Sequence, residues 1–467
     1  MRRFLASMVL ALLAWLPPCA SGHDAPAFGR LGAVQVQRPD ATPEAVVLLL
    51  SDDAGWGEAE AAIARALAGH GVLVGGIDSA HWRRALAAGG EPCAYPAADL
   101  EGFAHWLQSR ERMPRYRQPV VVGVGGGGAL AYALLAQSPA GTFAGALSLG
   151  FCPTLAPIAP LCEANALRVR RDADGATRPA PVALRDPWAV LVGSAGAACP
   201  AAAATAFVAG LSNARAGVLH GAGPAAVAGT AWSAAAVAAV RVLARRADAP
   251  VAAPADPGLA DLPLVEVPAS GDGDLLAILV TGDGGWAGLD QDVAAALAAR
   301  GVPVVALNSL KYFWTARTPQ GTADDLGRIA RHYLAAWGRR RLLLVGYSQG
   351  ADVLPFAINR LDPALRGRIA GAALLGLGER ASFAFHVSHW LEDPADGEPT
   401  APEVLRAAAV GLSCVRGAEE TDSPCASFAA AGVRDVVLPG GHHFDGDYAA
   451  VAHAVMDAAR GAIPPGR

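Results

Sequence analysis

The chain alternates short apolar runs with segments in which apolar residues recur every three or four positions. Leu342–Val345 is an apolar run of the kind that forms a buried strand, and the following residues 351–361 have helical spacing. The order strand, loop, amphipathic helix and strand occurs in residues 46–79 and again in residues 276–309. This alternation predicts an α/β fold with mainly parallel sheets.

The two halves of the chain repeat each other. Residues 46–56 match residues 276–286 at an offset of 230, and residues 122–129 match residues 345–352 at an offset of 223. The apolar strands persist in both halves, which indicates a duplicated domain rather than a chance match. We therefore predict two tandem domains of the same α/β class.

The boundaries of these domains follow from composition. Residues 247–263 are rich in Pro and Ala and have no apolar periodicity, which is typical of a linker. It separates a domain of residues 24–246 from one of residues 264–463. Residues 1–22 have the charged start, the apolar stretch and the small-residue exit of a secretory signal peptide, so we expect a periplasmic protein that is soluble after export.

A G-x-S-x-G motif follows the apolar run in the second half. In Gly346-Tyr-Ser-Gln-Gly350 the two glycines allow a sharp turn from strand to helix, which exposes Ser348 at its tip. The motif is short, and the chain has 54 Gly, so the pattern by itself is weak. Its place between a predicted strand and a predicted helix favours a nucleophile elbow, the hallmark of α/β-hydrolases.

A serine nucleophile needs a base and an acid, and both follow in the chain order of that fold. After the predicted last strand, Pro-Gly-Gly precedes His442, which we favour as the base, with His443 as the alternative. For the acid we prefer Asp422, with Glu420 close behind, because both follow the end of a predicted strand. The alternative for each carboxylate is a solvated loop charge.

The tetrahedral intermediate needs two N–H donors. We expect one from the backbone of Gln349, the residue after the nucleophile. The second is expected from the glycine loop 282–286, at Gly284, since glycines let backbone amides approach a ligand closely.

The N-terminal copy lacks this chemistry. In the repeat register Gly125 stands where Ser348 does, and Gly223 stands where His442 does. Gly196 and Ala198 face Glu420 and Asp422. We therefore predict a degenerate N-terminal domain that keeps the fold without the nucleophile, acid and base.

Composition excludes several classes of protein. The 467 residues are 53% hydrophobic and carry a net charge of −5, which argues against disorder and against nucleic-acid binding. The uncharged stretch 118–162 is interrupted by glycines and prolines, so it predicts a strand, a turn and a helix rather than a membrane span. No Cys and His spacing resembles a zinc site, and no metal or other cofactor is expected.

Six cysteines remain after the predicted signal peptide, an even number that suggests disulfides in an oxidising compartment. Cys152 with Cys162 and Cys414 with Cys425 are the pairs close in sequence, which leaves Cys93 with Cys199. Buried free thiols are the alternative, and sequence does not fix the pairing.

Four longer motifs resemble those of a known family. They are Gly-Tyr-Ser-Gln-Gly-Ala-Asp-Val-Leu-Pro-Phe (346–356), Gly-Asp-Gly-Gly-Trp (282–286), Asn-Ser-Leu-Lys-Tyr-Phe-Trp (308–314) and Gly-Gly-His-His-Phe-Asp-Gly-Asp-Tyr (440–448). Together they are similar to the bacterial virulence family of AcvB and VirJ, and the extra N-terminal domain resembles the longer AcvB type. Gln349 departs from the pattern, since Phe is expected there in many relatives.

The resemblance implies a periplasmic α/β-hydrolase-like enzyme that hydrolyses the aminoacyl ester of lysyl-phosphatidylglycerol at the inner-membrane surface. Recognition of the cationic lysyl group would need acidic partners, for which Asp283 and Asp352 are candidates, although a structural role suits each equally well. The alternative function is a non-catalytic periplasmic adaptor or chaperone for type IV secretion of virulence factors, with secretion components as partners.

Overall fold

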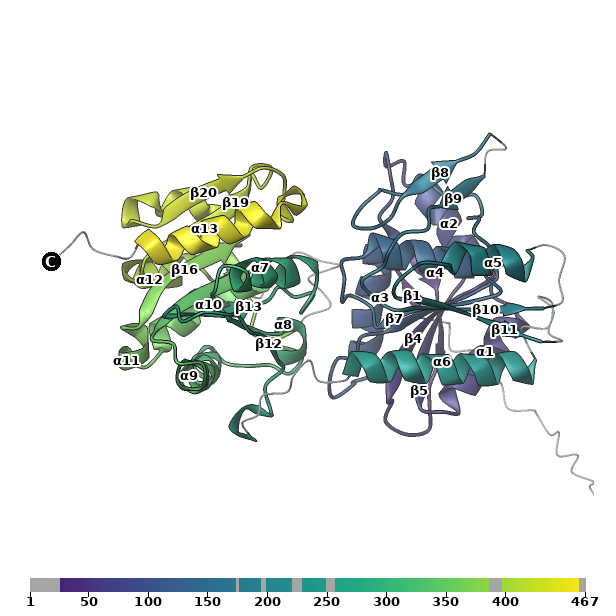
Figure 1. The fold of residues 1–467 in the computed structure, drawn as a ribbon, viewed down its shortest axis with the longest axis horizontal. Coiled ribbons are helices and arrows are strands. Elements are labelled where there is room, and N and C mark those ends of the chain that lie inside the picture. The colour runs from purple at the N-terminus through teal and green to yellow at the C-terminus, as the bar shows by residue number, and fades with distance from the viewer. Residues whose placement is uncertain are drawn as a thin grey trace, which may run out of the picture.

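The computed structural model describes residues 26–173, 176–194, 199–220, 229–248, 257–385 and 397–461, so the predicted signal peptide lies outside the described residues. Figure 1 shows two lobes side by side, each with a sheet between helices. Each sheet has seven strands. Within the described ranges, no helix has the length and apolar character needed to cross a membrane.

The N-terminal sheet has the strand order β11-β10-β7-β6-β4-β5-β3. Its strands are β3 (Gln35–Gln37), β4 (Ala45–Leu50), β5 (Val72–Ile77), β6 (Val120–Val124), β7 (Gly145–Leu149), β10 (Trp188–Gly193) and β11 (Ala214–Leu219). The helices are α1 (Glu58–Ala68), α2 (Ser79–Ala88), α3 (Pro96–Arg110), α4 (Gly126–Gln137), α5 (Ala201–Val208) and α6 (Thr230–Asp248). Only β3 pairs antiparallel in this sheet.

The C-terminal sheet has the order β12-β14-β13-β15-β16-β19-β20. Its strands are β12 (Leu264–Val267), β13 (Leu275–Val280), β14 (Val304–Leu307), β15 (Arg341–Tyr347), β16 (Ile369–Leu375), β19 (Leu412–Gly417) and β20 (Arg434–Leu438). The helices are α7 (Gly288–Ala298), α8 (Ser309–Tyr312), α9 (Pro319–Ala336), α10 (Gln349–Arg360), α11 (Pro363–Arg366), α12 (Ala401–Ala407) and α13 (Tyr448–Gly461). The antiparallel edge strand is β12.

The two sheets correspond strand for strand. Each begins with an antiparallel edge strand, and each continues through six parallel strands in the same spatial order. The prediction of tandem α/β domains is therefore confirmed. Short polar residues repeat as well, because the Ser79 amide donates to Ser51 and the Ser309 amide donates to Thr281, both at 2.9 Å.

Helices cover both faces of each sheet, which explains why the central strands are apolar on both sides. All six residues of β4 are buried. In the N-terminal domain, α1 and α6 pack on one face, and α3 and α4 pack on the other. In the C-terminal domain the corresponding pairs are α7 with α13 and α9 with α10.

The predicted linker is partly built into the second domain. Helix α6 ends at Asp248 and strand β12 begins at Leu264, close to the predicted limits. Leu259 and Leu262, however, are buried in the C-terminal core at 2% and 5% exposure. These two leucines anchor the end of the linker, a role that the low periodicity of the segment did not indicate.

The disulfides differ from the pairing expected from sequence distance. Cys414 pairs with Cys425 as expected, but the other pairs are Cys93 with Cys162 and Cys152 with Cys199. Cys152 follows β7 and Cys199 follows β10, and these strands are neighbours in the sheet, so their ends lie together. Cys93 and Cys162 instead adjoin the isolated bridge between Ala94 and Leu161. The prediction from proximity along the chain was wrong for these four cysteines.

The two domains meet beside the loop between β13 and α7. The Gly288 amide donates to the carbonyl of Ala140 at 3.1 Å, and Arg185 pairs with Asp292 at 2.9 Å. The indole of Trp314 donates to the carbonyl of Met113 at 2.8 Å. The N-terminal domain thus supports a loop at the active end of the second sheet.

Candidate active site

Ser348 lies at the turn between β15 and α10, with φ 51° and ψ −121°. This left-handed backbone is strained for a non-glycine residue, and it is typical of a nucleophile elbow. A Cβ atom on Gly346 would lie 2.4 Å from the carbonyl of Gly350, and one on Gly350 would lie 2.0 Å from the carbonyl of Val280. Both glycines are therefore required by close backbone contacts, as the motif predicted.

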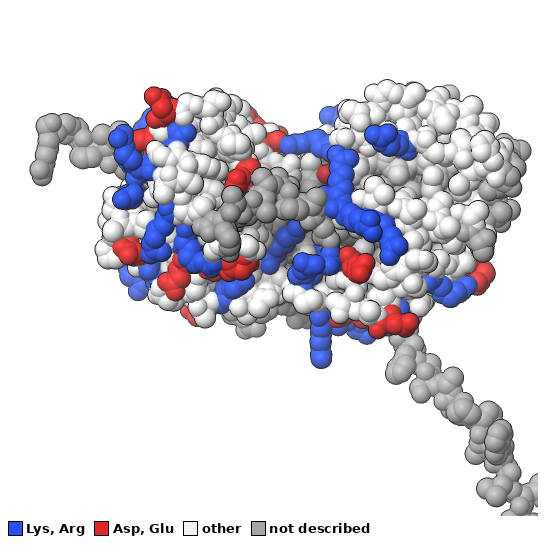
Figure 2. Space-filling model, turned by 60° about the horizontal axis from the view of Figure 1, so that its bottom comes forward, with Lys and Arg blue, Asp and Glu red and all other residues white. Residues whose placement is uncertain are grey.

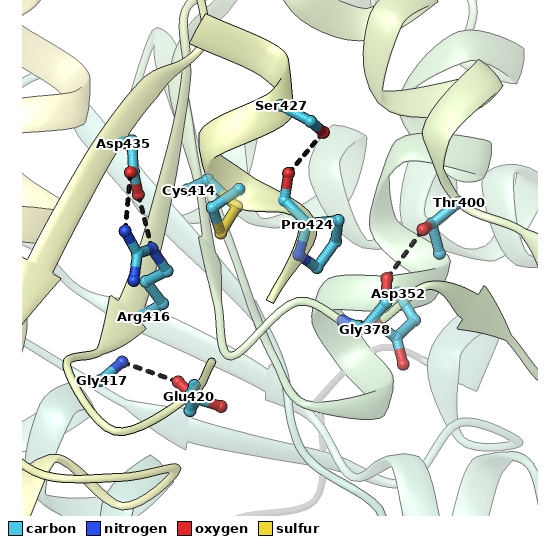
Figure 3. The surroundings of a disulfide bond; sticks show 11 residues. Asp352, Gly378, Thr400, Cys414, Arg416, Gly417, Glu420, Pro424, Ser427 and Asp435 are labelled. Atoms are coloured by element: carbon cyan, nitrogen blue, oxygen red, sulfur yellow. Dashed lines mark hydrogen bonds and ion pairs between the residues drawn. A yellow bond between two sulfur atoms is a disulfide. The ribbon is translucent and has the colours of Figure 1, made fainter. Parts of the chain in front are cut away.

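His442 lies in the turn after β20 and contacts Glu420, which follows β19. Its Nδ1 is 2.6 Å from Oε1 of Glu420. The other carboxylate oxygen of Glu420 accepts a hydrogen bond from the Gly417 amide at 2.7 Å, as Figure 3 shows. The carboxylate is thus held at both oxygens and fixes the imidazole so that Nε2 is left for the nucleophile.

Asp422, our preferred acid, does not occupy this position. Its side chain is exposed, and no described residue forms a hydrogen bond or ion pair with it. The chain reverses at Gly417, so that Glu420 points back toward β20 while Asp422 points to solvent. The structure thus brings Glu420, the alternative acid, to His442 and leaves Asp422 apart, because the distance from the strand end does not show which side chain turns inward.

The two adjacent histidines have different environments. His443 Nδ1 is 3.0 Å from the hydroxyl of Tyr347, the residue before Ser348. Burial, followed by the neighbouring charge of His442, lowers the pKa of His443. His442 instead carries the carboxylate contact, so the structure favours His442 as the base and gives His443 a packing and hydrogen-bonding position.

The imidazole of His442 is near the elbow but is not hydrogen-bonded to Ser348 within the described residues. Its ring centroid is 5.4 Å from that of Tyr347. A Cβ atom on Gly376, after β16, would lie 2.6 Å from its Cε1, so the imidazole packs on the backbone beside β16. Catalytic hydrogen bonds are often longer in the free enzyme and shorten when substrate binds.

The predicted oxyanion donors lie in different settings. The backbone amide of Gln349 begins helix α10 directly after Ser348, and its side chain donates to the Ser382 carbonyl at 3.2 Å. Gly284 faces the N-terminal domain, since a Cβ there would lie 3.4 Å from Glu101 Oε1. Gly282 is closer to the elbow, because a Cβ on it would lie 3.5 Å from the Cβ of Ser348. The amide between them belongs to Asp283.

Buried carboxyl groups surround the elbow. Burial, opposed by the Gly378 amide and reinforced by the charge of Asp283, raises the pKa of Asp352 to about 8. Asp352 accepts a hydrogen bond from that amide at 2.7 Å, which braces the loop after β16. Burial and then the charge of Asp283 also raise the pKa of Glu101 to about 8. These groups create a region in which further negative charge is unfavourable and a cation would be stabilised.

Glu101 was not singled out from sequence. It belongs to α3 in the other domain, and its approach to Gly284 depends on how the two domains pack. No local pattern in residues 96–110 indicates it. Among the described residues, no group of three or more His, Cys, Asp and Glu side chains is arranged to hold a metal ion.

The N-terminal copy keeps the elbow without its serine. Gly125 has φ 55° and ψ −119°, within a few degrees of Ser348. Gly196, Ala198 and Gly223, the predicted counterparts of the acid and base positions, lie outside the described residues.

The chain is similar to several solved structures, each over less than half of its length. An alpha-beta serine hydrolase homologue from Coxiella burnetii is 13% identical, covers 45% of this chain and 89% of its own, and has a TM-score of 0.29. The esterase domain of a Rhodothermus marinus protein is 16% identical, with coverage of 45% and 90% and a TM-score of 0.29. Est1E from Butyrivibrio proteoclasticus is 13% identical, with coverage of 46% and 93% and a TM-score of 0.29.

No curated protein matches the chain in sequence. Residues 274–463 match the family described as Bacterial virulence protein (VirJ), a range that runs from just before β13 past the end of α13. The resemblance inferred from the four motifs is therefore confirmed for residues 274–463, which make up most of the C-terminal domain and are similar to the VirJ family.

Proposed function

We propose that the protein is a periplasmic serine esterase that hydrolyses the aminoacyl ester of lysyl-phosphatidylglycerol. The main support for an esterase is the contact between Glu420 and His442 at 2.6 Å, which lies next to the strained elbow that presents Ser348. A binding module needs neither the strained backbone nor an imidazole held by a carboxylate. The substrate class rests on the family resemblance and on the acidic groups near the elbow.

The proposed reaction follows from the positions of these groups. Nε2 of His442 accepts the proton of Ser348, and Oγ attacks the carbonyl carbon of the ester that joins the lysyl group to the glycerol of the lipid. The tetrahedral intermediate collapses, the C–O bond to glycerol breaks, and protonated His442 gives its proton to the departing oxygen. Water, deprotonated by His442, then attacks the lysyl-serine ester and releases lysine.

The oxyanion is stabilised by backbone amides. The amide of Gln349 stands at the N-terminus of α10, where the helix dipole also favours negative charge. For the second donor we propose Asp283 in place of Gly284, because Gly284 faces Glu101 whereas Gly282 adjoins Ser348. The glycines 282 and 285 shape this turn, and Gly285 has φ 77°.

Recognition of the lysyl group is assigned to the carboxyl groups around the elbow. Asp283 and Asp352 were named for this from sequence, and Glu101 joins them from the N-terminal domain. A carboxyl group whose pKa is raised to about 8 is largely protonated at neutral pH, and a bound ammonium would lower that pKa. Binding of the dicationic head would therefore release protons to the solvent.

The experiment measures free lysine released from lysyl-phosphatidylglycerol in mixed micelles by wild-type protein and by Ser348→Ala. We expect release by wild type and a loss of at least about 10³-fold in the variant. Alanyl-phosphatidylglycerol and a simple acyl ester, tested in parallel, show whether the acyl group or only the ester is recognised. Release of lysine at equal rates by both proteins would exclude Ser348 as the nucleophile.

A non-catalytic adaptor for type IV secretion is the second candidate. The N-terminal domain supports it, since that domain keeps the elbow backbone at Gly125 without a nucleophile. No hydrolysis of any ester in the panel, together with retained folding, would favour the adaptor.

A further inference from the structure

The N-terminal domain contains a cavity of about 890 Å³ at the place that corresponds to the active site of the second domain. Its lining includes Asp52, Gly125 and Gly150, which follow β4, β6 and β7, and Gly193, which ends β10. The carboxyl ends of parallel strands are where ligands bind in open α/β sheets. The volume is within the range of about 300–1,000 Å³ found for ligand pockets.

A carboxylate of the protein itself fills the oxyanion position of this copy. Oδ1 of Asp52 accepts hydrogen bonds from the amides of Gly126 and Asp53, both at 2.8 Å. In the repeat register these amides correspond to those of Gln349 and Asp283 in the other domain. A Cβ on Gly125 would lie 2.3 Å from the same oxygen, so Asp52 also occupies the space of a nucleophile. This pocket is built to hold a ligand without attacking it.

The acidic and basic side chains that line the cavity are equal in number, so their charges cancel. Asp53 pairs with Arg83 at 2.7 Å, and Asp52 and Arg171 complete a set of two acids and two bases among the lining residues. A ligand with a net charge gains little from such a set. The balance favours an uncharged polar group.

Trp232 indicates what that group must offer. It lines the cavity and is 1% exposed, and its indole N–H has no hydrogen-bond acceptor among the residues that the structure describes. A buried donor left without a partner costs free energy, which a ligand acceptor would recover. The cavity also has an apolar wall, which is lined by Phe151, Leu155, Pro157 and Ile158.

From these features we infer that the N-terminal domain binds an uncharged acyl ester: the acyl chain lies along the apolar wall, and an ester carbonyl accepts from Trp232. The ligand is held without being cleaved. The domain would thus be a second lipid-binding site, separate from the chemistry at Ser348, and the inference stands whether or not the C-terminal domain is an esterase.

The test uses the full chain carrying Ser348→Ala, so that no ester is consumed, and titrates it with monolauroylglycerol below its micelle concentration by calorimetry. We expect one bound molecule per chain. Trp232→Phe keeps an aromatic side chain but removes the N–H donor, and should weaken binding about fivefold. Ala156→Trp fills the cavity and should weaken it at least about tenfold. Trp106→Phe, which alters a tryptophan stacked on Phe103 away from the cavity, should leave binding unchanged.

Laurate and dodecylammonium serve as charged comparators with the same chain length. Tighter binding of either than of the ester would overturn the assignment to an uncharged group. Absence of binding, or binding that neither Trp232→Phe nor Ala156→Trp changes, would overturn the site itself. If thermal melting shows that Ala156→Trp does not fold, Trp232→Phe decides the outcome.

Discussion

At the scale of single residues, the acid of the site is the sharpest question. Glu420 and Asp422 are two positions apart, but only Glu420 contacts His442 and accepts from Gly417. We predict that Glu420→Gln lowers kcat/KM for a chromogenic ester by about 10²–10⁴-fold, since the imidazole loses the partner that fixes its tautomer. Asp422→Asn is the matched control and should stay within about twofold of wild type. The reverse order of effects would restore Asp422 as the acid.

A second residue-scale prediction concerns pH. Burial, followed in weight by the charge of Asp283, raises the pKa of Asp352 to about 8, so between its usual value of about 3.9 and 8 the folded state binds more protons than the unfolded state. The free energy of unfolding from this group therefore falls as pH rises through that window. Asp352→Asn keeps an acceptor for Gly378 and should narrow the difference in melting temperature between pH 5 and pH 8. Asp422→Asn is the control and should show the same difference in melting temperature as wild type. If Asp352→Asn also shows that full difference between pH 5 and pH 8, the prediction is contradicted.

Much of the site could be predicted from sequence, and the residues that sequence did not indicate were missed for a physical reason. The elbow at Ser348 and the turn that carries His442 depend on local glycines, which are visible as motifs. The inward turn of Glu420 depends on the backbone after β19, and the approach of Glu101 depends on packing between domains. Neither leaves a local pattern.

At the scale of elements, the disulfide between Cys414 and Cys425 closes the loop that follows β19. The two cysteines are 11 positions apart in sequence, and Glu420 lies between them. Figure 3 shows this bond beside the strand that leads to Gly417. We predict that replacing both cysteines by serine lowers the free energy of unfolding by about 2–4 kcal/mol, measured by urea denaturation. It should also lower kcat more than it raises KM, because the carboxylate loses its fixed position. An unchanged kcat would show that the disulfide does not help to hold Glu420.

The N-terminal elbow gives another element-scale prediction. Gly125→Ser should not create a nucleophile, because Asp52 occupies both the oxyanion position and the space of the new side chain. Mass spectrometry after fluorophosphonate treatment of this variant in a Ser348→Ala background should find no label at position 125. A label there would show that Asp52 moves away readily.

The elements themselves were predicted well because strands buried on both faces read as apolar runs. Two of the three disulfides were not, since they join cysteines that the tertiary fold, rather than sequence distance, brings together. Cys152 and Cys199 lie beyond the ends of the neighbouring strands β7 and β10. Strand order is a property of the whole sheet.

At the scale of the whole molecule, basic side chains gather near the junction of the domains. Figure 2 shows Lys and Arg along this junction on one face. Arg112 and Arg115 are exposed there, in the segment whose Met113 carbonyl accepts from Trp314 of the other domain. The lipid substrate that we propose would lie in an anionic membrane, and each basic residue near such a surface contributes about 1 kcal/mol to binding.

We therefore predict that the double variant Arg112→Glu, Arg115→Glu sediments less with vesicles that contain phosphatidylglycerol, while binding to phosphatidylcholine vesicles stays the same. The double variant Arg434→Glu, Arg460→Glu changes the net charge equally but at β20 and α13, and should sediment like wild type. Equal losses in both would mean that net charge, not the junction, governs membrane association.

We propose that His442, held by Glu420, activates Ser348. Fluorophosphonate labelling followed by peptide mass spectrometry measures that activation without assuming a substrate. We expect modification of Ser348 in wild type and in Asp422→Asn, and labelling at least about 10²-fold slower in His442→Ala and Glu420→Gln. Wild-type protein that stays unlabelled at Ser348, or is labelled as fast when His442 is replaced, would contradict it.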